Sequence, residues 1–169
     1  MLIFLIGFMG SGKTTIGKKL AKKMKYAFLD LDQEIERQEK LTISEIFEIH
    51  GEDYFRALEK KVLVDLTQLS NTVVSCGGGT PCHFNNIDLI NNAGISIYIQ
   101  LSAEALHSRL KTAKTQRPLL KNRDESELLD FIKSKLNERQ SCYLKSKIVI
   151  PGLDVNIENL INYISYIKQ

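Results

Sequence analysis

Short apolar runs alternate with longer amphipathic segments along most of the chain. The apolar runs have the length of strands, and the amphipathic segments repeat their apolar residues every three or four positions, as helices do. This pattern predicts strands within residues 2–6, 26–32, 71–80, 94–101 and 147–150. It predicts helices within residues 13–24, 33–39, 84–93, 102–111, 124–145 and 155–168, and a short helical turn followed by a longer helix within 41–69. Strands that alternate with helices predict one parallel sheet with helices on both of its faces.

Polar or glycine-rich segments lie at the carboxyl ends of four of the predicted strands. They are GFMGSGKT at 7–14, DLD at 30–32, GGG at 77–79 and PG at 151–152. In open parallel sheets, ligands bind at the carboxyl ends of the strands. We therefore expect these four segments to lie close together and to form a binding site.

The segment GFMGSGKT matches the phosphate-binding motif G-x-x-x-x-G-K-[ST]. It lies between a predicted strand and a predicted helix, which is the order that the motif requires. Glycines let backbone N–H groups approach a phosphate closely, and the following helix directs its positive end at the anion. We expect Lys13 to reach the β- and γ-phosphate oxygens of a nucleotide and Thr14 to bind Mg²⁺. The motif leaves the acceptor of the γ-phosphate open.

A carboxylate for the metal is missing from its usual place. Nucleotide hydrolases with this loop carry an Asp at the end of another core strand, but VVSCGGG has Ser75 near that point, and the guanine-reading motif N-K-x-D is absent. The DLD segment is the alternative source. In a strand, Asp30 and Asp32 would point to the same side, so one could bind Mg²⁺ while the other binds an acceptor hydroxyl and takes its proton. Without the phosphate loop, the same pattern would suit two solvated acids at a strand end.

Two arginines are candidates for binding an anionic acceptor. Arg139 falls on the apolar face of its predicted helix, where it is costly unless it meets an anion or its head reaches solvent. Its planar fork suits a carboxylate. Arg56 has Glu52 and Glu59 at i−4 and i+3, a spacing that favours an ordinary surface ion pair. The residues alone leave both assignments open.

The stretch from residue 111 to residue 123 breaks the regular pattern and contains five basic residues and no acidic one. Such a stretch beside a phosphate site is typical of a closing lid, here at about 112–124. Arg117 could then stabilise charge on the transferred phosphoryl group. A solvated basic loop is the alternative. The glycines at 77–79 would allow a substrate to approach the backbone closely, or would simply form a turn.

Composition adds limits to this picture. The chain has 169 residues, of which 43% are hydrophobic and 25% charged, and its net charge is +3. These values favour a single domain over residues 1–169 and give no reason to expect nucleic-acid or membrane partners. No apolar run approaches the roughly 20 residues of a membrane span, and the N-terminus lacks the pattern of a signal peptide. We expect a cytoplasmic monomer, with Cys76, Cys82 and Cys142 as reduced thiols.

Several segments, taken together and in this order, resemble the shikimate kinase family: GFMGSGKT, LDLD, GEDYFRALE, the GGG after VVSC, QRPLL and NERQSCY. The resemblance covers nearly the whole chain. It implies a three-layer α/β/α P-loop NTPase fold of the nucleoside monophosphate kinase-like type, with a five-stranded parallel sheet in the order 2-3-1-4-5 and a mobile lid. It also implies a kinase that uses ATP and Mg²⁺ to phosphorylate the 3-hydroxyl of a small-molecule substrate, shikimate.

The resemblance implies a role for each candidate residue. Catalysis would depend on Lys13, Asp32 and Arg117. ATP would be bound by Gly10, Ser11, Gly12, Lys13, Thr14, Thr15, Arg109 and Arg117. Shikimate would be bound by Asp32, Arg56, Gly78, Gly79 and Arg139, with the two arginines on its carboxylate. Mg²⁺ would be bound by Thr14 and Asp30.

The chain departs from the family pattern at two places. Pro151 and Gly152 follow the last predicted strand, where the adenine loop of the family usually carries an Asp soon after the strand. Cys142 stands where a proline is more usual. Neither departure touches phosphoryl transfer directly.

Two other functions fit parts of the pattern. A P-loop kinase for gluconate or for a nucleoside monophosphate would share the phosphate loop. A nucleotide-binding switch would need the loop but no acceptor site. The acids of the DLD segment and the inward position of Arg139 favour a protein with an acceptor.

Overall fold

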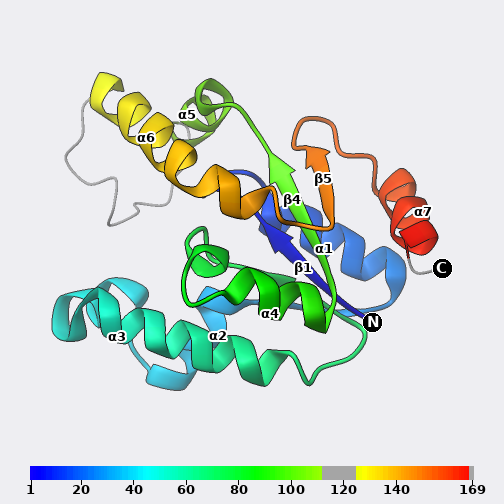
Figure 1. The fold of residues 1–169 in the computed structure, drawn as a ribbon, viewed down its shortest axis with the longest axis horizontal. Coiled ribbons are helices and arrows are strands. Elements are labelled where there is room, and N and C mark those ends of the chain that lie inside the picture. Colours follow the sequence, from blue (N-terminus) through cyan, green and yellow to red (C-terminus); the bar gives the residue numbers. More distant parts are fainter. Residues whose placement is uncertain (112–124, 168–169) are drawn as a thin grey trace.

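A five-stranded sheet forms the centre of the molecule (Figure 1). The computed structural model describes residues 1–111 and 125–167 of the chain. The strands are β1 (Leu2–Ile6), β2 (Ala27–Asp30), β3 (Thr72–Ser75), β4 (Ile95–Gln100) and β5 (Ile148–Pro151). They lie in the order β2-β3-β1-β4-β5 with every neighbouring pair parallel, so the predicted sheet is confirmed. The predicted lid at about 112–124, with Arg117, lies outside the described residues.

Helices cover both faces of the sheet, which confirms the predicted three layers (Figure 1). The helices are α1 (Lys13–Met24), α2 (Leu31–Glu39), α3 (Ile43–Leu66), α4 (Asn86–Ala93), α5 (Ala103–Lys111), α6 (Glu125–Tyr143) and α7 (Ile157–Ile167), with a short 3₁₀ helix η1 (Thr80–Cys82). Within the described part of the chain, no helix has both the length and the apolar character that crossing a membrane requires.

Both faces of the central strand β1 are buried, which explains why its sequence is apolar at every position. Leu2, Phe4 and Ile6 pack into the core formed with α2, α3 and α4. Ile3 and Leu5 point to the opposite face and pack with α1 and α7. Because both faces of a central parallel strand are buried, each position takes an apolar residue. The phosphate loop that follows this strand therefore starts from a rigid support.

The predicted strand at 26–32 is too long at its carboxyl end. β2 ends at Asp30 and α2 begins at Leu31, so Asp32 lies in the first turn of a helix. The alternation in LDLD resembles a strand, but Leu31 and Ile35 are both fully buried at a spacing of four, which is helical. Asp32 also interacts favourably with the positive end of this helix. The prediction that the two acids share one side of a strand is therefore wrong.

Helix α3 is broken at Gly51, which confirms the predicted short turn followed by a longer helix. Gly51 has φ 81° and ψ 175°, a backbone conformation that is essentially restricted to glycine. The first part begins with a capping box, in which Thr42 and Glu45 each accept a hydrogen bond from the other's backbone N–H. With this break, the ring centres of Phe47 and Phe55 lie 4.7 Å apart. Both phenylalanines line the cavity described below.

Replacing Gly51 by Ala should destabilise the protein through backbone strain alone. Apart from Gly51 itself, its two chain neighbours and the adjacent backbone of its helix, no atom of the described residues lies within 4 Å of the position that a Cβ would occupy. We expect the unfolding free energy, measured by urea denaturation, to fall by about 1–3 kcal/mol. Glu48→Ala, at an exposed position of the same helix, is the control and should change it by less than about 0.5 kcal/mol. A Gly51→Ala variant as stable as the parent would contradict the assigned strain.

Candidate active site

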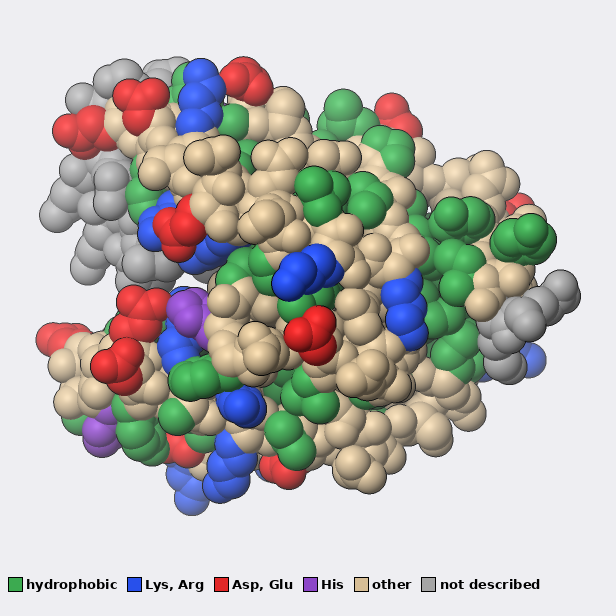
Figure 2. All heavy atoms as spheres, in the orientation of Figure 1, with side chains coloured by type: hydrophobic (Ala, Val, Ile, Leu, Met, Phe, Trp, Pro, Cys, Tyr) green, Lys and Arg blue, Asp and Glu red, His purple; other side chains and the backbone are tan. Residues whose placement is uncertain are grey.

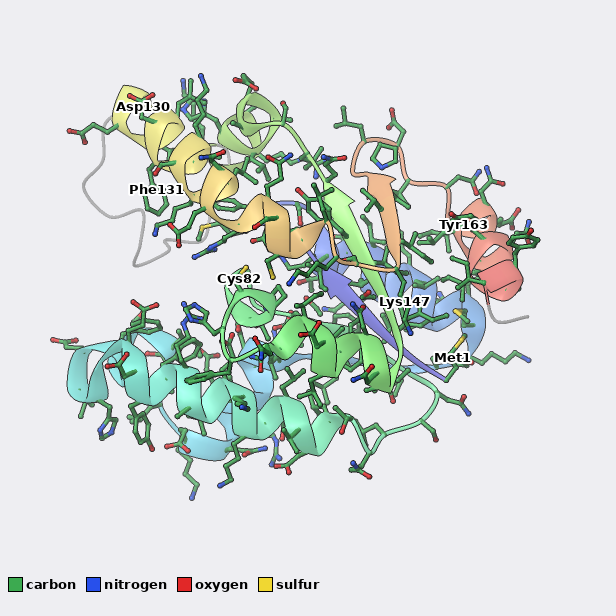
Figure 3. The ribbon with its side chains drawn as sticks, in the orientation of Figure 1. Met1, Cys82, Asp130, Phe131, Lys147 and Tyr163 are labelled. Carbon is green, nitrogen blue, oxygen red and sulfur yellow. The ribbon has the colours of Figure 1, made fainter. Side chains whose placement is uncertain are left out.

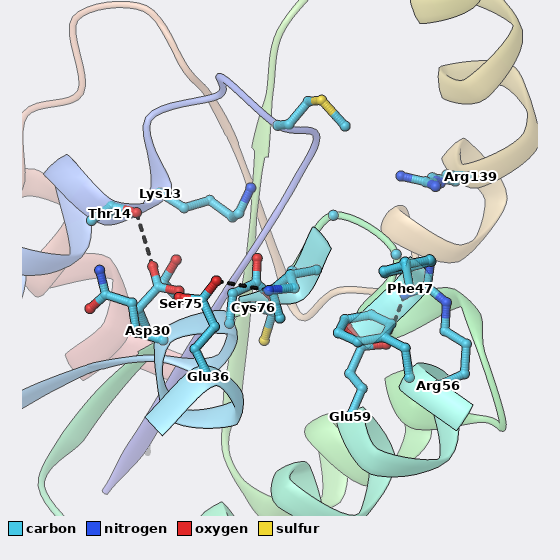
Figure 4. A pocket seen from close by; sticks show the side chains of 18 residues that line it. Lys13, Thr14, Asp30, Glu36, Phe47, Arg56, Glu59, Ser75, Cys76 and Arg139 are labelled. Carbon is cyan, nitrogen blue, oxygen red and sulfur yellow. Dashed lines mark hydrogen bonds and ion pairs between the residues drawn. The ribbon is translucent and has the colours of Figure 1, made fainter. Parts of the chain in front are cut away.

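A cavity of about 420 Å³ opens at the carboxyl ends of the strands (Figure 4). Among the residues predicted from the sequence, those that line it are Lys13, Thr14, Asp30, Asp32, Arg56, Gly78, Gly79 and Arg139. In Figure 4, Lys13, Thr14 and Asp30 lie on one side of the cavity, and Arg56 and Arg139 lie on the other. The fold thus brings the predicted donor and acceptor residues to one place.

The phosphate loop wraps around the start of α1. Gly10 and Gly12 have φ of 79° and 95°, in the left-handed region where a side chain would be strained. These turns lead into the N-terminus of α1, whose free N–H groups and positive end favour an anion. Lys13 Nζ donates hydrogen bonds to the carbonyl oxygens of Gly7 and Phe8 at 2.8 and 2.9 Å. Its charge therefore lies beside the loop, where a phosphate would bind.

Arg109 of α5 connects the phosphate loop to the segment after β5. Its Nη1 and Nη2 donate to the carbonyl oxygens of Ser11 at 3.1 Å and Gly152 at 3.2 Å. Gly152 is closely packed, since a Cβ there would lie 2.8 Å from Ile99 Cγ2. This packing gives a physical reason for a glycine at the position that departs from the family pattern. Two other residues that were predicted to bind ATP lie outside the cavity lining that the described residues form. Ser11 is buried, and Thr15 is exposed.

Thr14 and Asp30 bring two oxygens together beside the loop. Thr14 is the second residue of α1, and its Oγ1 donates to Asp30 Oδ2 at 3.1 Å. Asp30 ends β2 and keeps an extended backbone with φ −105° and ψ 121°, while α2 begins at the next residue. Hydroxyl and carboxylate oxygens are hard ligands of the kind that Mg²⁺ takes. The pair therefore has the chemistry of the predicted metal site.

Asp32 lies against the turn formed by the glycines at 77–79 after β3, called the glycine turn below. A Cβ at Gly77 would lie 2.8 Å from Asp32 Oδ1, 2.9 Å from Thr80 Oγ1 and 3.0 Å from Glu59 Oε1. The absence of a side chain at Gly77 therefore lets three polar groups approach one point. Asp32 lines the cavity, as the sequence predicted. It does so from the first turn of a helix and not from the predicted strand.

Arg56 is bound by two carboxylates in a mostly buried position. Glu52 Oε1 accepts from its Nε and Nη2 at 3.2 and 3.0 Å, and Glu59 Oε2 accepts from Nη1 at 3.0 Å. The side chain of Arg56 is only 10% exposed and that of Glu59 1%, so the second pair is buried and not the surface ion pair that the spacing favoured. Thr80 donates to Glu59 Oε1 at 2.5 Å. A Cβ at Gly79 would lie 2.8 Å from Arg56 Nη1, so the guanidinium packs directly on the turn.

Helix α6 packs on the same glycine turn. The Tyr143 hydroxyl donates to the carbonyl oxygen of Gly78 at 2.6 Å, and burial raises the pKa of Tyr143, which keeps the hydroxyl a donor. One turn earlier, the Arg139 guanidinium carbon lies 5.8 Å from the ring centre of Phe8, and a Cβ at Gly78 would lie 3.4 Å from Arg139 Nη1. Of the two alternatives for Arg139, the structure favours the one in which it faces the cavity (Figure 4).

Sequence reasoning missed other residues of the cavity. The additional lining residues include Met9, Gln33, Glu36, Ile43, Phe47, Phe55 and Glu59. The spacing of Arg56 and Glu59 pointed to a pair, but spacing alone cannot distinguish a buried pair from an exposed one. Cys76 also lines the cavity, and burial raises the pKa of its thiol, so this sulfur stays protonated.

Comparisons with known proteins show which family the chain is similar to. The family model for shikimate kinase matches residues 9–166. A shikimate kinase of Phocaeicola vulgatus is 46% identical over 145 residues, which cover 86% of this chain and 83% of the relative. The crystal structure of a shikimate kinase from Bacteroides thetaiotaomicron matches with a TM-score of 0.92 at 35% identity, covering 99% of this chain and 98% of that one.

Two further solved structures distinguish similarity to the family from similarity of the fold alone. A shikimate kinase from Acinetobacter baumannii, solved in complex with shikimate, matches with a TM-score of 0.84 at 33% identity, covering 99% of this chain and 92% of that one. A gluconokinase from Sinorhizobium meliloti shares the fold alone, with a TM-score of 0.57 at 15% identity. The family match spans most of the chain, and the cavity is lined by residues from five of the six segments that carried the resemblance. The chain belongs to the shikimate kinase family.

Proposed function

We propose that this protein transfers the γ-phosphoryl group of ATP to the 3-hydroxyl of shikimate, giving shikimate 3-phosphate and ADP. The observation that carries the proposal is a single cavity in which a phosphate loop and two arginines lie on opposite sides (Figure 4). The loop suits a nucleotide donor, and the arginines suit an acceptor that carries a carboxylate. Shikimate as that acceptor follows from membership of the family.

ATP would bind with its phosphates on the loop. The backbone at 10–12 and the N-terminus of α1 would hold the β-phosphate, with Ser11 and Thr15 beside it. Lys13 Nζ now donates to two loop carbonyls. When Lys13 binds the β- and γ-phosphate oxygens, it would exchange these neutral acceptors for charged ones, which form stronger hydrogen bonds. Arg109, which contacts both the loop and the segment after β5, would border the adenine.

Mg²⁺ would bind at Thr14 and Asp30. Their two oxygens lie 3.1 Å apart, and both are hard ligands that would suit this ion. Water and phosphate oxygens commonly complete such a site. When bound, the ion neutralises charge on the β- and γ-phosphate oxygens. Lys13 acts on the same oxygens from the protein side.

Shikimate would bind opposite the loop, with its carboxylate between Arg56 and Arg139. Arg56 is already oriented by Glu59, and Arg139 is packed between Phe8 and the glycine turn. Groups that are held in place before binding lose less conformational entropy when the substrate arrives. The backbone at 78–79 would complete the acceptor site, since it lies directly against both guanidinium groups.

Asp32 would bind the acceptor hydroxyl and accept its proton as that hydroxyl attacks the γ-phosphate. The first turn of α2 favours the charged carboxylate, because the positive end of the helix is close to it. Asp30 is engaged with Thr14, so the two acids of the DLD segment take different tasks. Arg117 would stabilise charge on the transferred group, and the lid would exclude water; both assignments rest on the family resemblance.

The length and composition of the chain support the proposals on organisation. Residues 1–169 would form a single domain that acts as a monomer on a small-molecule substrate in the cytoplasm. Size-exclusion chromatography with light scattering measures the oligomeric state directly, and a stable dimer would contradict this part of the proposal.

Shikimate-dependent release of ADP by the purified protein tests the function. ATP and Mg²⁺ are held constant while shikimate, gluconate and a nucleoside monophosphate are supplied in turn. We expect ADP release with shikimate and a background rate with the other two. Turnover on gluconate without shikimate would overturn the proposed acceptor. Tight ATP binding with no acceptor-dependent ADP release would identify a nucleotide-binding switch instead.

Replacing Arg139 by Ala should weaken shikimate binding and leave ATP binding unchanged. A hydrogen bond to a charged group contributes about 1.5–3 kcal/mol, which corresponds to a rise of about ten- to a hundredfold in the KM for shikimate. Steady-state kinetics with each substrate varied in turn measures this effect. Arg37→Ala removes an arginine whose side chain is 71% exposed and pairs with Glu34, so it should leave both KM values unchanged. An unaltered KM for shikimate in Arg139→Ala would rule out the carboxylate clamp.

Matched Asp→Asn substitutions should separate the tasks of the two acids. Asp32→Asn removes the proton acceptor and should lower kcat by about 10²–10⁴-fold. Asp30→Asn should raise the Mg²⁺ concentration needed for half-maximal activity by at least about tenfold. Asp53→Asn, an exposed change of the same kind, should affect neither. Equal effects of Asp30→Asn and Asp32→Asn on the Mg²⁺ requirement would contradict the division of roles.

A further inference from the structure

Tyr143, the last residue of α6, is a buried residue that binds the wall of the cavity. Its ring packs in the apolar core against that of Tyr98, with 5.0 Å between the ring centres. Its hydroxyl donates a hydrogen bond of 2.6 Å to the carbonyl oxygen of Gly78. Burial raises the pKa of Tyr143, so the hydroxyl keeps its proton. The apolar core thus carries a hydroxyl whose partner lines the cavity.

This hydrogen bond lies where α6 meets the glycine turn. The 3₁₀ helix η1 follows the turn directly, and Figure 3 shows its last residue, Cys82, beside the end of α6. Arg139 lies one helical turn before Tyr143 on α6. The surface is hollowed between α6 and α3, with Lys and Arg side chains at the edges of the hollow (Figure 2). Tyr143 therefore anchors the backbone of the turn on the side of the cavity that also holds Arg139.

The same hydrogen bond fixes the orientation of the peptide unit between Gly78 and Gly79. This unit is trans and planar, so its C=O and N–H groups point in opposite directions. Because Tyr143 holds the carbonyl oxygen of Gly78 on the side of α6, the N–H of Gly79 points away from α6. Both residues are glycines, whose backbone has many accessible conformations, so sterics alone would leave the peptide unit free to turn. The hydroxyl of Tyr143 supplies the restraint.

The N–H of Gly79 is placed to bind a ligand. Gly79 is buried, and within residues 1–111 and 125–167 no protein group accepts a hydrogen bond from its N–H. A buried backbone donor is costly unless water or a ligand accepts from it. A Cβ at Gly79 would lie 2.8 Å from Arg56 Nη1, and a Cβ at Gly78 would lie 3.4 Å from Arg139 Nη1. The peptide unit therefore borders both arginines, and an anion bound there would meet two guanidinium groups and this N–H.

We propose that Tyr143 is a positioning residue for the acceptor. Through the carbonyl of Gly78, its hydroxyl directs the N–H of Gly79 at the acceptor carboxylate, which binds between the two arginines. Tyr143 is not itself among the described residues that line the cavity, so it acts through the peptide unit. The hydrogen bond also ties the helix of Arg139 to the glycine turn, so one hydroxyl sets the place of a backbone donor and of a guanidinium group. The identity of the anion rests on the proposed function, and the orientation of the peptide unit does not.

Replacing Tyr143 by Phe removes the hydroxyl and keeps the ring in the core. The KM for shikimate should rise by about two- to tenfold, which is the effect of one lost hydrogen bond. The KM for ATP should stay unchanged, because the hydrogen bonds of Lys13 and Arg109 at the phosphate loop do not involve Tyr143. Tyr98→Phe, the matched control, removes the hydroxyl of the neighbouring buried ring and should change neither KM. An unchanged KM for shikimate in Tyr143→Phe, with or without a loss of unfolding free energy in urea, would overturn the proposal.

Two structural measurements complete the test. In crystals of Tyr143→Phe, the peptide unit between Gly78 and Gly79 should be turned or should have two orientations. The parent orientation, with Arg139 in its place, would overturn the positioning role. In NMR spectra of the isotope-labelled parent, saturating shikimate should shift the amide proton resonance of Gly79 downfield, and an unmoved resonance would overturn the contact even if the variant did not fold.

The outcome for the proposed function is separate. A parent that neither binds shikimate nor releases ADP with it would contradict the proposed function. The orientation of the peptide unit in crystals of Tyr143→Phe would still decide whether Tyr143 positions it.

Discussion

The buried carboxylate of Glu59 holds Arg56 and the start of η1 together at one wall of the cavity. Its two oxygens accept hydrogen bonds from Arg56 Nη1 at 3.0 Å and from Thr80 Oγ1 at 2.5 Å. A buried charge is costly unless it is paired and fully hydrogen-bonded, so both partners are kept in fixed positions. Arg56 is thereby oriented toward the cavity from α3, and Thr80 fixes the start of η1 after the glycine turn. The close approach at Gly77 brings Asp32 to the same point.

The parallel sheet explains why the phosphate loop, Asp30 and the glycine turn border one cavity. Every strand has its carboxyl end at one edge, so the phosphate loop after β1, Asp30 at the end of β2 and the glycine turn after β3 are neighbours although they are distant in sequence. Helix α6 completes the cavity from outside the sheet. The hydrogen bond from Tyr143 to Gly78 holds α6 on the glycine turn, and this contact places Arg139 opposite the loop.

The two acids of the DLD segment show how a change of backbone conformation over one residue can direct neighbouring carboxylates to different places. Asp30 has extended backbone and meets Thr14 at the start of α1. Asp32 has helical backbone and lies against Gly77. On a continuous strand, both side chains would point the same way. The start of α2 between them directs one carboxylate to Thr14 and the other to the glycine turn.

Much of the fold can be predicted from the sequence, because periodicity reflects the backbone geometry of each segment. The fully apolar LIFLI predicts a strand with both faces buried, and GFMGSGKT predicts a phosphate loop in its required place between strand and helix. Family resemblance supplied the strand order, which the structure confirms. The same periodicity misled at LDLD, where a period of two in four residues also fits the start of a helix.

Burial was decided only by tertiary structure. The spacing of Arg56 and Glu59 is the same for a surface pair and a buried pair, and only the packing of η1 on α3 makes it buried. The direction of Arg139 depends on the contact between α6 and the glycine turn. Local sequence encodes which backbone geometry a segment adopts. Which side chains lose water and meet one another depends on segments that arrive from elsewhere in the chain.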